Sequence, residues 1–213
     1  MDNKSKEIIE DLIGQLSNIS HINPGDIPNI ELYMDQVTTF MDSKLAPTKR
    51  YKDDKILTKT MINNYAKNKL LPPPIKKKYT SEHMVMLILI YYFKSFLSIN
   101  DIQEILNPIS DKFFDNDKSN TDLLKIYEEI YSEQKSKIED EVKDITDKYK
   151  KSQTSFENFP KDEKDFLQLF EFIASLSFDI YVKKHLLEQL IDRLNHNNDI
   201  KKDEKTKKKN PVK

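Results

Sequence analysis

The sequence predicts a mainly α-helical protein, and three observations support that prediction. Glycine occurs only 2 times in 213 residues, which leaves few of the turn glycines that sheet-rich folds use. Charged residues make up 33% of the chain, and apolar residues recur at three- and four-residue steps through most of it. The only strand candidate is a short basic segment that follows Pro72 to Pro74, three prolines that cannot continue a helix.

Composition narrows the class of protein further. The absence of cysteine excludes disulfides, thiolate metal sites and a cysteine nucleophile. The longest apolar run, residues 84–93, is far shorter than the roughly 20 residues that a membrane span needs. Residues 1–10 are charged and do not have the pattern of a secretory signal. We therefore expect a cytoplasmic protein without a membrane partner.

The formal net charge of −1 conceals a separation of charge along the chain. Residues 49–78 contain ten basic and two acidic residues, whereas residues 121–150 contain nine acidic and six basic ones. A basic segment of this kind beside an acidic one favours a module that binds a polyanion.

The first 28 residues are expected to form a short helix and a linker. The helix covers residues 4–17, and Pro24, Gly25 and Pro28 break the structure that follows it. One face of the helix carries Ile8, Ile9, Leu12, Ile13 and Leu16. That face packs on its own domain or braces a partner, and the sequence leaves both possibilities open.

Residues 57–106 are the stretch around which the rest of the chain is organised. A helix at 30–45 precedes it, and a second helix at 58–68 begins at Thr58, whose hydroxyl can cap the first turn. The prolines and a basic hairpin come next. Residues 81–97 then form a helix that is apolar all round and must be buried on all sides.

A short helix at 99–106 completes this stretch. Ser98 is a plausible N-cap for it, and Pro108 is expected to end it. The polar, turn-forming residues 111–120 are expected to mark a domain boundary.

This ordered series resembles the winged helix-turn-helix of MerR-type transcription regulators. The resemblance is carried by Thr58, Ile62, Tyr65, Leu70, Leu71, Pro72 and Pro73, by Lys76–Thr80, and by Ser98, Asp101, Ile102, Ile105 and Leu106. Residues 33–108 are more closely similar to the bacterial domain-of-unknown-function family numbered 1836, which is grouped as MerR-like. The sequence departs from the MerR pattern at Asn63 and Asn64, at the longer segment 47–56, and at Lys69, where the family often has Gly.

The resemblance implies a winged helix-turn-helix DNA-binding domain over residues 29–109, with a small wing hairpin and with the helix at 58–68 as the reading helix. The predicted DNA-contacting residues are Lys49, Arg50, Lys59, Thr60, Asn63, Asn64, Lys67, Lys76, Lys77, Lys78 and Tyr79. Asparagine can pair with adenine in the major groove, and lysine can reach guanine or phosphate. Taken singly, most such side chains are ordinary solvated surface residues. The neighbouring wing and the local charge favour contact with DNA.

A helical C-terminal region is expected over residues 121–197, followed by a disordered Lys-rich tail at 198–213. One long helix is predicted at 121–150 and another at 164–195. The resemblance to MerR-type proteins, which dimerise through a helix after the DNA-binding domain, implies a homodimer. Both helices are placed for this, and the helix at 164–195 is favoured because it carries apolar residues on several faces. The predicted interface residues are Phe166, Leu169, Ile173, Leu176, Ile180, Leu187, Leu190 and Leu194. The alternative is that these two helices and the helix at 81–97 form a single monomeric core.

Motifs for catalysis or cofactor binding are absent from the sequence. There is no HExxH, P-loop, G-x-G-x-x-G or G-x-S-x-G, and the four histidines lack metal-ligand spacing. We therefore expect no catalytic residues, no metal, no other cofactor and no enzymatic activity. The predicted function is a sequence-specific transcription regulator that binds double-stranded DNA as a homodimer. The alternative is an all-helical protein–protein interaction module that does not bind DNA.

Overall fold

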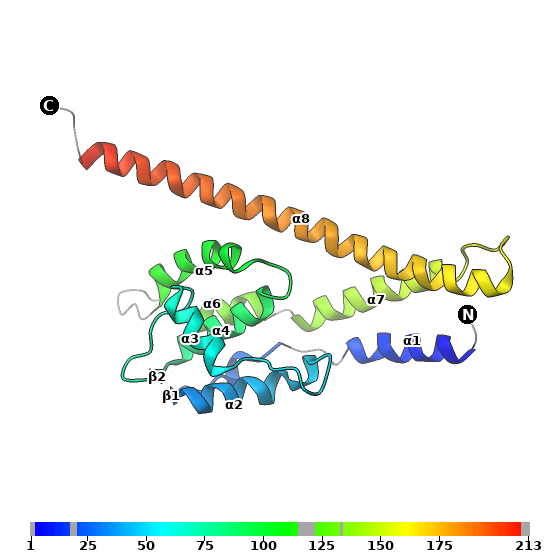
Figure 1. Ribbon diagram of the computed structural model, residues 1–213, viewed down its shortest axis with the longest axis horizontal. Helices are drawn as coiled ribbons and strands as arrows, with labels where there is room; N and C mark the ends of the chain where they lie inside the picture. Colours follow the sequence, from blue (N-terminus) through cyan, green and yellow to red (C-terminus); the bar gives the residue numbers. More distant parts are fainter. Residues whose placement is uncertain (1–2, 18–20, 115–121, 133, 210–213) are drawn as a thin grey trace. The chain divides into compact units, whose positions relative to one another are not determined.

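The computed structural model of this chain is mainly helical (Figure 1). It describes residues 3–17, 21–114, 122–132 and 134–209. The α-helices are α1 (Asn3–Leu16), α2 (Met34–Leu45), α3 (Lys59–Lys67), α4 (Ser81–Phe93), α5 (Ile99–Phe113), α6 (Leu123–Tyr131), α7 (Gln134–Ser152) and α8 (Lys161–Lys209). Two short 3₁₀ turns, η1 (Pro24–Asp26) and η2 (Ala46–Thr48), and two strands, β1 (Leu32–Tyr33) and β2 (Lys78–Tyr79), complete the described elements.

The chain divides into two compact units. The first unit comprises Met1–His21 and Ile130–Lys183. The second unit comprises Ile22–Glu129 and Lys184–Lys213. Among the described residues, no helix is both long enough and apolar enough to cross a membrane.

Helix α4 forms the centre of the second unit. Its residues from His83 to Ile90 are all buried, which confirms the prediction from its apolar sequence. The helix ends at Phe93, four residues before the predicted end. The buried residues contributed by the other helices of this core are Val37, Met41 and Leu45 of α2, Ile62 and Tyr65 of α3, Ile102 and Leu106 of α5, and Leu123 and Tyr127 of α6.

The two strands pair in a way that the sequence did not reveal. Strand β2 lies antiparallel to β1, with Leu32 opposite Tyr79 and Tyr33 opposite Lys78. We expected a helix from residue 30, but β1 occupies residues 32–33 and α2 begins only at Met34. The segment before β2 contributes a single bridge, Ile75 to Lys78. The prolines that precede Ile75 have no N–H to donate to a ladder, so β2 takes its partner from upstream of α2.

Helix α5 contradicts the prediction that Pro108 ends the helix. Ser98 caps α5 as expected, since its Oγ accepts a hydrogen bond from the Asp101 N–H at 3.2 Å. The helix then continues through Pro108 to Phe113. Proline deprives the carbonyl four residues earlier, that of Glu104, of its N–H partner. Glu104 is exposed, so water can satisfy that carbonyl and the interruption costs less than it would in a core.

The predicted single helix at 121–150 is two helices, α6 and α7. Leu123 and Tyr127 of α6 are buried in the second unit, whereas Tyr149 of α7 is buried in the first. Helix α6 therefore lies in the unit that begins at Ile22, although it follows the domain boundary that the sequence predicted at residues 111–120. Part of the predicted boundary segment, residues 115–120, lies outside the described residues.

The first unit is built from α1, α7 and the first part of α8. Helix α1 packs along α7. Lys148 of α7 bridges Asp144 of its own helix and Asp179 of α8, with 2.8 Å between Lys148 Nζ and Asp179 Oδ2. The Gln168 amide donates to the carbonyls of Gln153 and Ser155, which fastens the turn between α7 and α8.

Helix α8 extends beyond the predicted helix at both ends, from Lys161 to Lys209. It therefore enters the segment from residue 198 onward, for which the sequence predicted a disordered tail. Residues 210–213 lie outside the described residues.

Candidate nucleic-acid interface

Helix α3 has well-defined ends. Thr58 is its N-cap, and the Thr58 Oγ1 atom accepts a hydrogen bond from the Met61 N–H at 3.1 Å. At the other end Lys69 adopts a left-handed conformation with φ 58°. The Leu70 N–H donates to the Tyr65 carbonyl at 2.9 Å and the Lys69 N–H donates to the Ala66 carbonyl at 3.1 Å, which is the Schellman arrangement. Lysine thus stands where glycine is the usual residue.

The outward face of α3 is polar and exposed. Ile62 and Tyr65 anchor the opposite face in the core, and burial raises the pKa of the Tyr65 phenol. At about 100° per residue, Thr60 and Lys67 lie at the centre of the outward face. Asn63 and Asn64 flank them on either side, and all four side chains are exposed. The structure thus exposes together four of the residues predicted to contact DNA.

Lys59 lies at the edge of that face and has a partner within the protein. Its ammonium forms an ion pair with Asp35 of α2. Surface pairs of this kind contribute about 0–1 kcal/mol, so the pair orients the lysine without excluding an exchange to another anion. Lys59 is therefore less available than its neighbours for base recognition.

A tight turn at Lys76 and Lys77 precedes β2. Both residues have positive φ, 50° and 66°, and the Lys78 N–H donates to the Ile75 carbonyl at 2.9 Å. These values fit a type I′ turn, which favours Asn-Gly because each left-handed non-glycine residue costs roughly 1–2 kcal/mol. The turn places two strained lysines at its tip. We call residues 75–78 the wing turn.

Lys78 and Tyr79 are the other two residues of this segment that were predicted to contact DNA. One is paired with a carboxylate and the other is buried. Lys78 Nζ lies 2.8 Å from Glu31 Oε2, and the hydrogen bond to that carboxylate raises the pKa of Lys78. Tyr79 is only 2% exposed, and burial raises the pKa of its phenol. Tyr79 was predicted to contact DNA, but its side chain is buried in the core and is not accessible at the surface.

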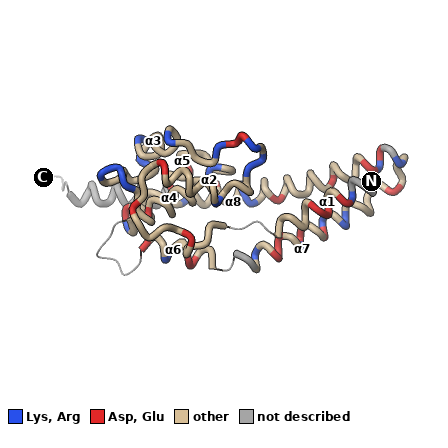
Figure 2. Tube along the Cα trace, turned by 90° about the horizontal axis from the view of Figure 1, so that it is seen from below, with Lys and Arg blue, Asp and Glu red and all other residues tan. Residues whose placement is uncertain are grey.

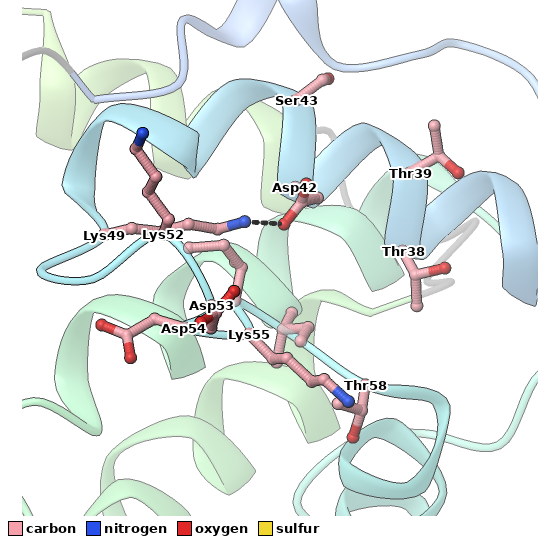
Figure 3. A pocket seen from close by; sticks show the side chains of 12 residues that line it. Thr38, Thr39, Asp42, Ser43, Lys49, Lys52, Asp53, Asp54, Lys55 and Thr58 are labelled. Atoms are coloured by element: carbon pink, nitrogen blue, oxygen red, sulfur yellow. Dashed lines mark ion pairs between the residues drawn. The ribbon is translucent and has the colours of Figure 1, made fainter.

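The segment between α2 and α3 borders an open hollow of about 520 Å³ (Figure 3). Lys49 reaches across it to α2, where its Nζ lies 2.6 Å from Asp42 Oδ1, and its side chain is only 18% exposed. Lys49 is therefore poorly placed for a phosphate contact. Arg50 is exposed, with its guanidinium carbon 5.3 Å from the centre of the Tyr51 ring.

Charge around α3 is predominantly positive in the tube view (Figure 2). Within the described part of the chain, seven cations of this region are exposed and have no acidic partner within 4.0 Å. They are Arg50, Lys52, Lys55, Lys67, Lys69, Lys76 and Lys77. Sequence reasoning placed Lys52, Lys55 and Lys69 in the basic stretch but did not select them. Their freedom from acidic partners emerges only in three dimensions.

Helix α8 carries a second exposed surface. Phe166, Ile173, Ile180, Leu187 and Leu194 recur every seven residues, and their side chains are between 37% and 66% exposed. Leu190 is also exposed, whereas Leu169 and Leu176 are half-buried. A regular apolar seam on a helix surface is the pattern that coiled-coil partners cover. We call the five residues of the seven-residue repeat the α8 seam.

Clusters that could hold a metal ion are absent from the described residues. The hollow beside α2 does contain three acidic side chains, Asp42, Asp53 and Asp54. Asp42 is paired with Lys49, and in Figure 3 the labelled side chains do not converge on a common point.

Residues 22–129 of the second unit thus form a small helical domain with a two-stranded sheet and a basic face. The family described as a domain of unknown function (DUF1836) matches residues 22–133, slightly more than half of the chain, and the chain belongs to this family. The matched range agrees with the structural boundary, since it includes α6. We found no curated protein and no solved structure that matches the chain.

Proposed function

We propose that this protein is a cytoplasmic transcription regulator that binds duplex DNA sequence-specifically through a MerR-like winged helix-turn-helix. In this proposal α2 and α3 are the helix-turn-helix, α3 enters the major groove, and the wing turn contacts the adjacent backbone or minor groove. The C-terminal helix α8 joins two copies.

The observation that carries the proposal is that lysines with a strained backbone lie at the end of α3 and at the tip of the wing turn. Four described residues other than glycine have positive φ, and three of them are Lys69, Lys76 and Lys77. Strained backbone is retained where the surrounding structure enforces it, and such positions cluster at functional sites. Lysine at these positions places positive charge at the end of α3 and at the wing tip, where glycine or asparagine would be less strained. A polyanion provides a physical reason for that charge.

The exposed face of α3 supports base contact in addition to phosphate contact. Thr60, Asn63 and Asn64 offer a methyl group and two amides, and this face includes no carboxylate that a phosphate would repel. Base edges are read by such groups, whereas lysines fix the protein on the backbone.

The α8 seam supports a dimer. One helix of nine residues contacts few base pairs, and two-fold pairing is the usual route to reading two half-sites. Five large apolar side chains at regular spacing supply a surface for a second α8. At about 1.5–3 kcal/mol for each fully buried side chain, their gross contribution is comparable with the cost of association.

Selection of binding sites from random duplex DNA with the purified chain tests the proposal. We expect an enriched sequence, and an affinity for it that falls steeply with salt because each phosphate contact releases counterions. Lys76→Gln with Lys77→Gln should weaken binding to every duplex. Lys143→Gln with Lys150→Gln, which changes two exposed lysines of α7, is the matched control and should bind as the unaltered chain does.

The protein–protein interaction module is the rival function. It predicts no enriched sequence, and only weak binding to DNA that the two pairs of substitutions reduce equally. That result would contradict the proposal.

A further inference from the structure

Resting on the proposed DNA binding, we infer that the protein reads an A·T-rich half-site, with adenine recognised in the major groove by Asn63 and Asn64. Two separate parts of the structure lead to this class of ligand. They are the composition of the exposed face of α3 and the composition of the wing turn.

The first part is the set of groups that α3 can present to a base edge. Asn63 and Asn64 flank the centre of the exposed face, and an asparagine amide matches adenine because its oxygen accepts from N6 and its nitrogen donates to N7. Thr60 lies between them and offers a methyl group that can contact the methyl of thymine. Guanine is read most often by arginine or lysine, and α3 contains no arginine.

The lysines of α3 do not change this preference for adenine over guanine. Lys59 is turned aside by its ion pair with Asp35, at the edge of the exposed face. Lys67 is in the last turn of α3 and is followed by Lys69, so this end of the helix carries two free cations. Two neighbouring cations at a helix end suit a phosphate strand better than a single guanine edge.

The second part is the wing turn. Lys78 is held by Glu31, so Lys76 and Lys77 are the cations left free at the tip. The tip has no amide or carboxylate side chain with which to read bases. It can respond to the electrostatic potential of the minor groove, which is most negative where A-tracts narrow the groove. Both parts of the structure therefore favour A·T base pairs.

Base analogues in the selected duplex separate the two contacts. 7-Deaza-adenine keeps Watson–Crick pairing and the minor groove but lacks the N7 acceptor. At the adenine that asparagine reads, we expect its use to weaken binding by the intact chain about tenfold. Replacing A·T pairs under the wing by inosine·cytosine should preserve affinity, because neither pair has the amino group that guanine places in the minor groove. Guanine·cytosine at the same positions should weaken binding.

Variants assign the effects to residues. In the chain with Asn63→Ala and Asn64→Ala, the affinity ratio between adenine and 7-deaza-adenine duplexes should fall to about one. Alanine favours a helix more than asparagine does, so α3 should still form, and thermal melting checks this. The control, Asn100→Ala with Asn158→Ala, alters two exposed asparagines elsewhere and should keep the tenfold ratio.

The outcomes distinguish this inference from the function on which it rests. A G·C-rich selected site, or 7-deaza-adenine without effect at every adenine, overturns the A·T inference and leaves DNA binding standing. Failure to enrich any duplex overturns both.

Discussion

Tyr127 of α6 donates a hydrogen bond from its hydroxyl to the carbonyl oxygen of Ile22 at 2.6 Å. The N–H of the same Ile22 donates to the Tyr92 hydroxyl at 3.0 Å. Two phenols, from α6 and α4, thus satisfy both main-chain groups of a residue that is 3% exposed. Burial also raises the pKa of Tyr92, which keeps its hydroxyl in the neutral form over the physiological range. The pair fixes the first residue of the family domain to its last helix.

The first prediction concerns this pair. Tyr127→Phe leaves the buried Ile22 carbonyl without its donor and should lower the free energy of unfolding by about 1–3 kcal/mol. Thermal or urea unfolding measures the loss. Tyr51→Phe removes the same hydroxyl from a ring that is 62% exposed and should change stability little. Equal effects of the two substitutions would mean that the hydrogen bond contributes nothing.

The second prediction concerns the end of α3. Lys69→Gly should raise the free energy of unfolding by about 1 kcal/mol, because glycine adopts positive φ without the steric cost that lysine bears. Lys67→Gly, two residues earlier and still in the helix, should lower it by up to about 1 kcal/mol. Opposite signs in a melting experiment confirm the left-handed cap. A loss of stability in both variants would contradict it.

The third prediction separates stability from binding at the wing turn. Lys76→Asn with Lys77→Gly supplies the residues that a type I′ turn prefers, so the melting temperature should rise. The same variant removes two positive charges, and DNA affinity should fall for all sequences. The slope of log affinity against log salt should decrease in magnitude by up to about 1.8, or 0.9 for each phosphate that a lysine no longer neutralises. A stabilised variant that binds DNA as the unaltered chain does would show that the wing turn does not contact DNA.

The fourth prediction concerns the α8 seam. The unaltered chain should sediment as a dimer of about 50 kDa at micromolar concentration, twice the 25.2 kDa of one chain. Leu187→Asp with Leu190→Asp should shift it to the monomer, because a charge in an apolar interface must be desolvated.

His185→Asp with Gln189→Asp provides the matched control for the seam. Both residues are exposed polar positions of the same helix on the face away from the seam, and this variant should remain dimeric. A monomeric unaltered chain would exclude the dimer. A variant that remains dimeric after the leucine substitutions would show that the interface does not include this part of α8.

Local signals in the sequence determined much of the helical architecture. The spacing of Ile62 and Tyr65 identified the buried face of α3, and Thr58 identified its first turn. Ser98 marked the beginning of α5 in the same way. These predictions succeeded because helical hydrogen bonds, capping and periodicity act over three or four residues. The fully apolar sequence of α4 likewise led directly to its burial.

Long-range contacts decided what those signals could not. Strand β1 forms because Leu32 pairs with Tyr79, and α6 joins the family domain because Tyr127 reaches Ile22. Partners so distant in the sequence leave no local pattern. The tertiary structure also decided where α5 ends. A proline within a helix is tolerated when the carbonyl that it leaves without an N–H partner is exposed to water.

In the candidate interface, too, some features were predicted from the sequence and others were shown only by the tertiary structure. The sequence located the basic stretch and the polar face of α3, because charge and helical phase are local properties. Only the tertiary structure showed that Lys78 is held by Glu31 and that Tyr79 is buried, while Lys76 and Lys77 remain free at the wing tip. The availability of a side chain depends on which groups the fold brings beside it, and that is set by packing between segments far apart in the chain.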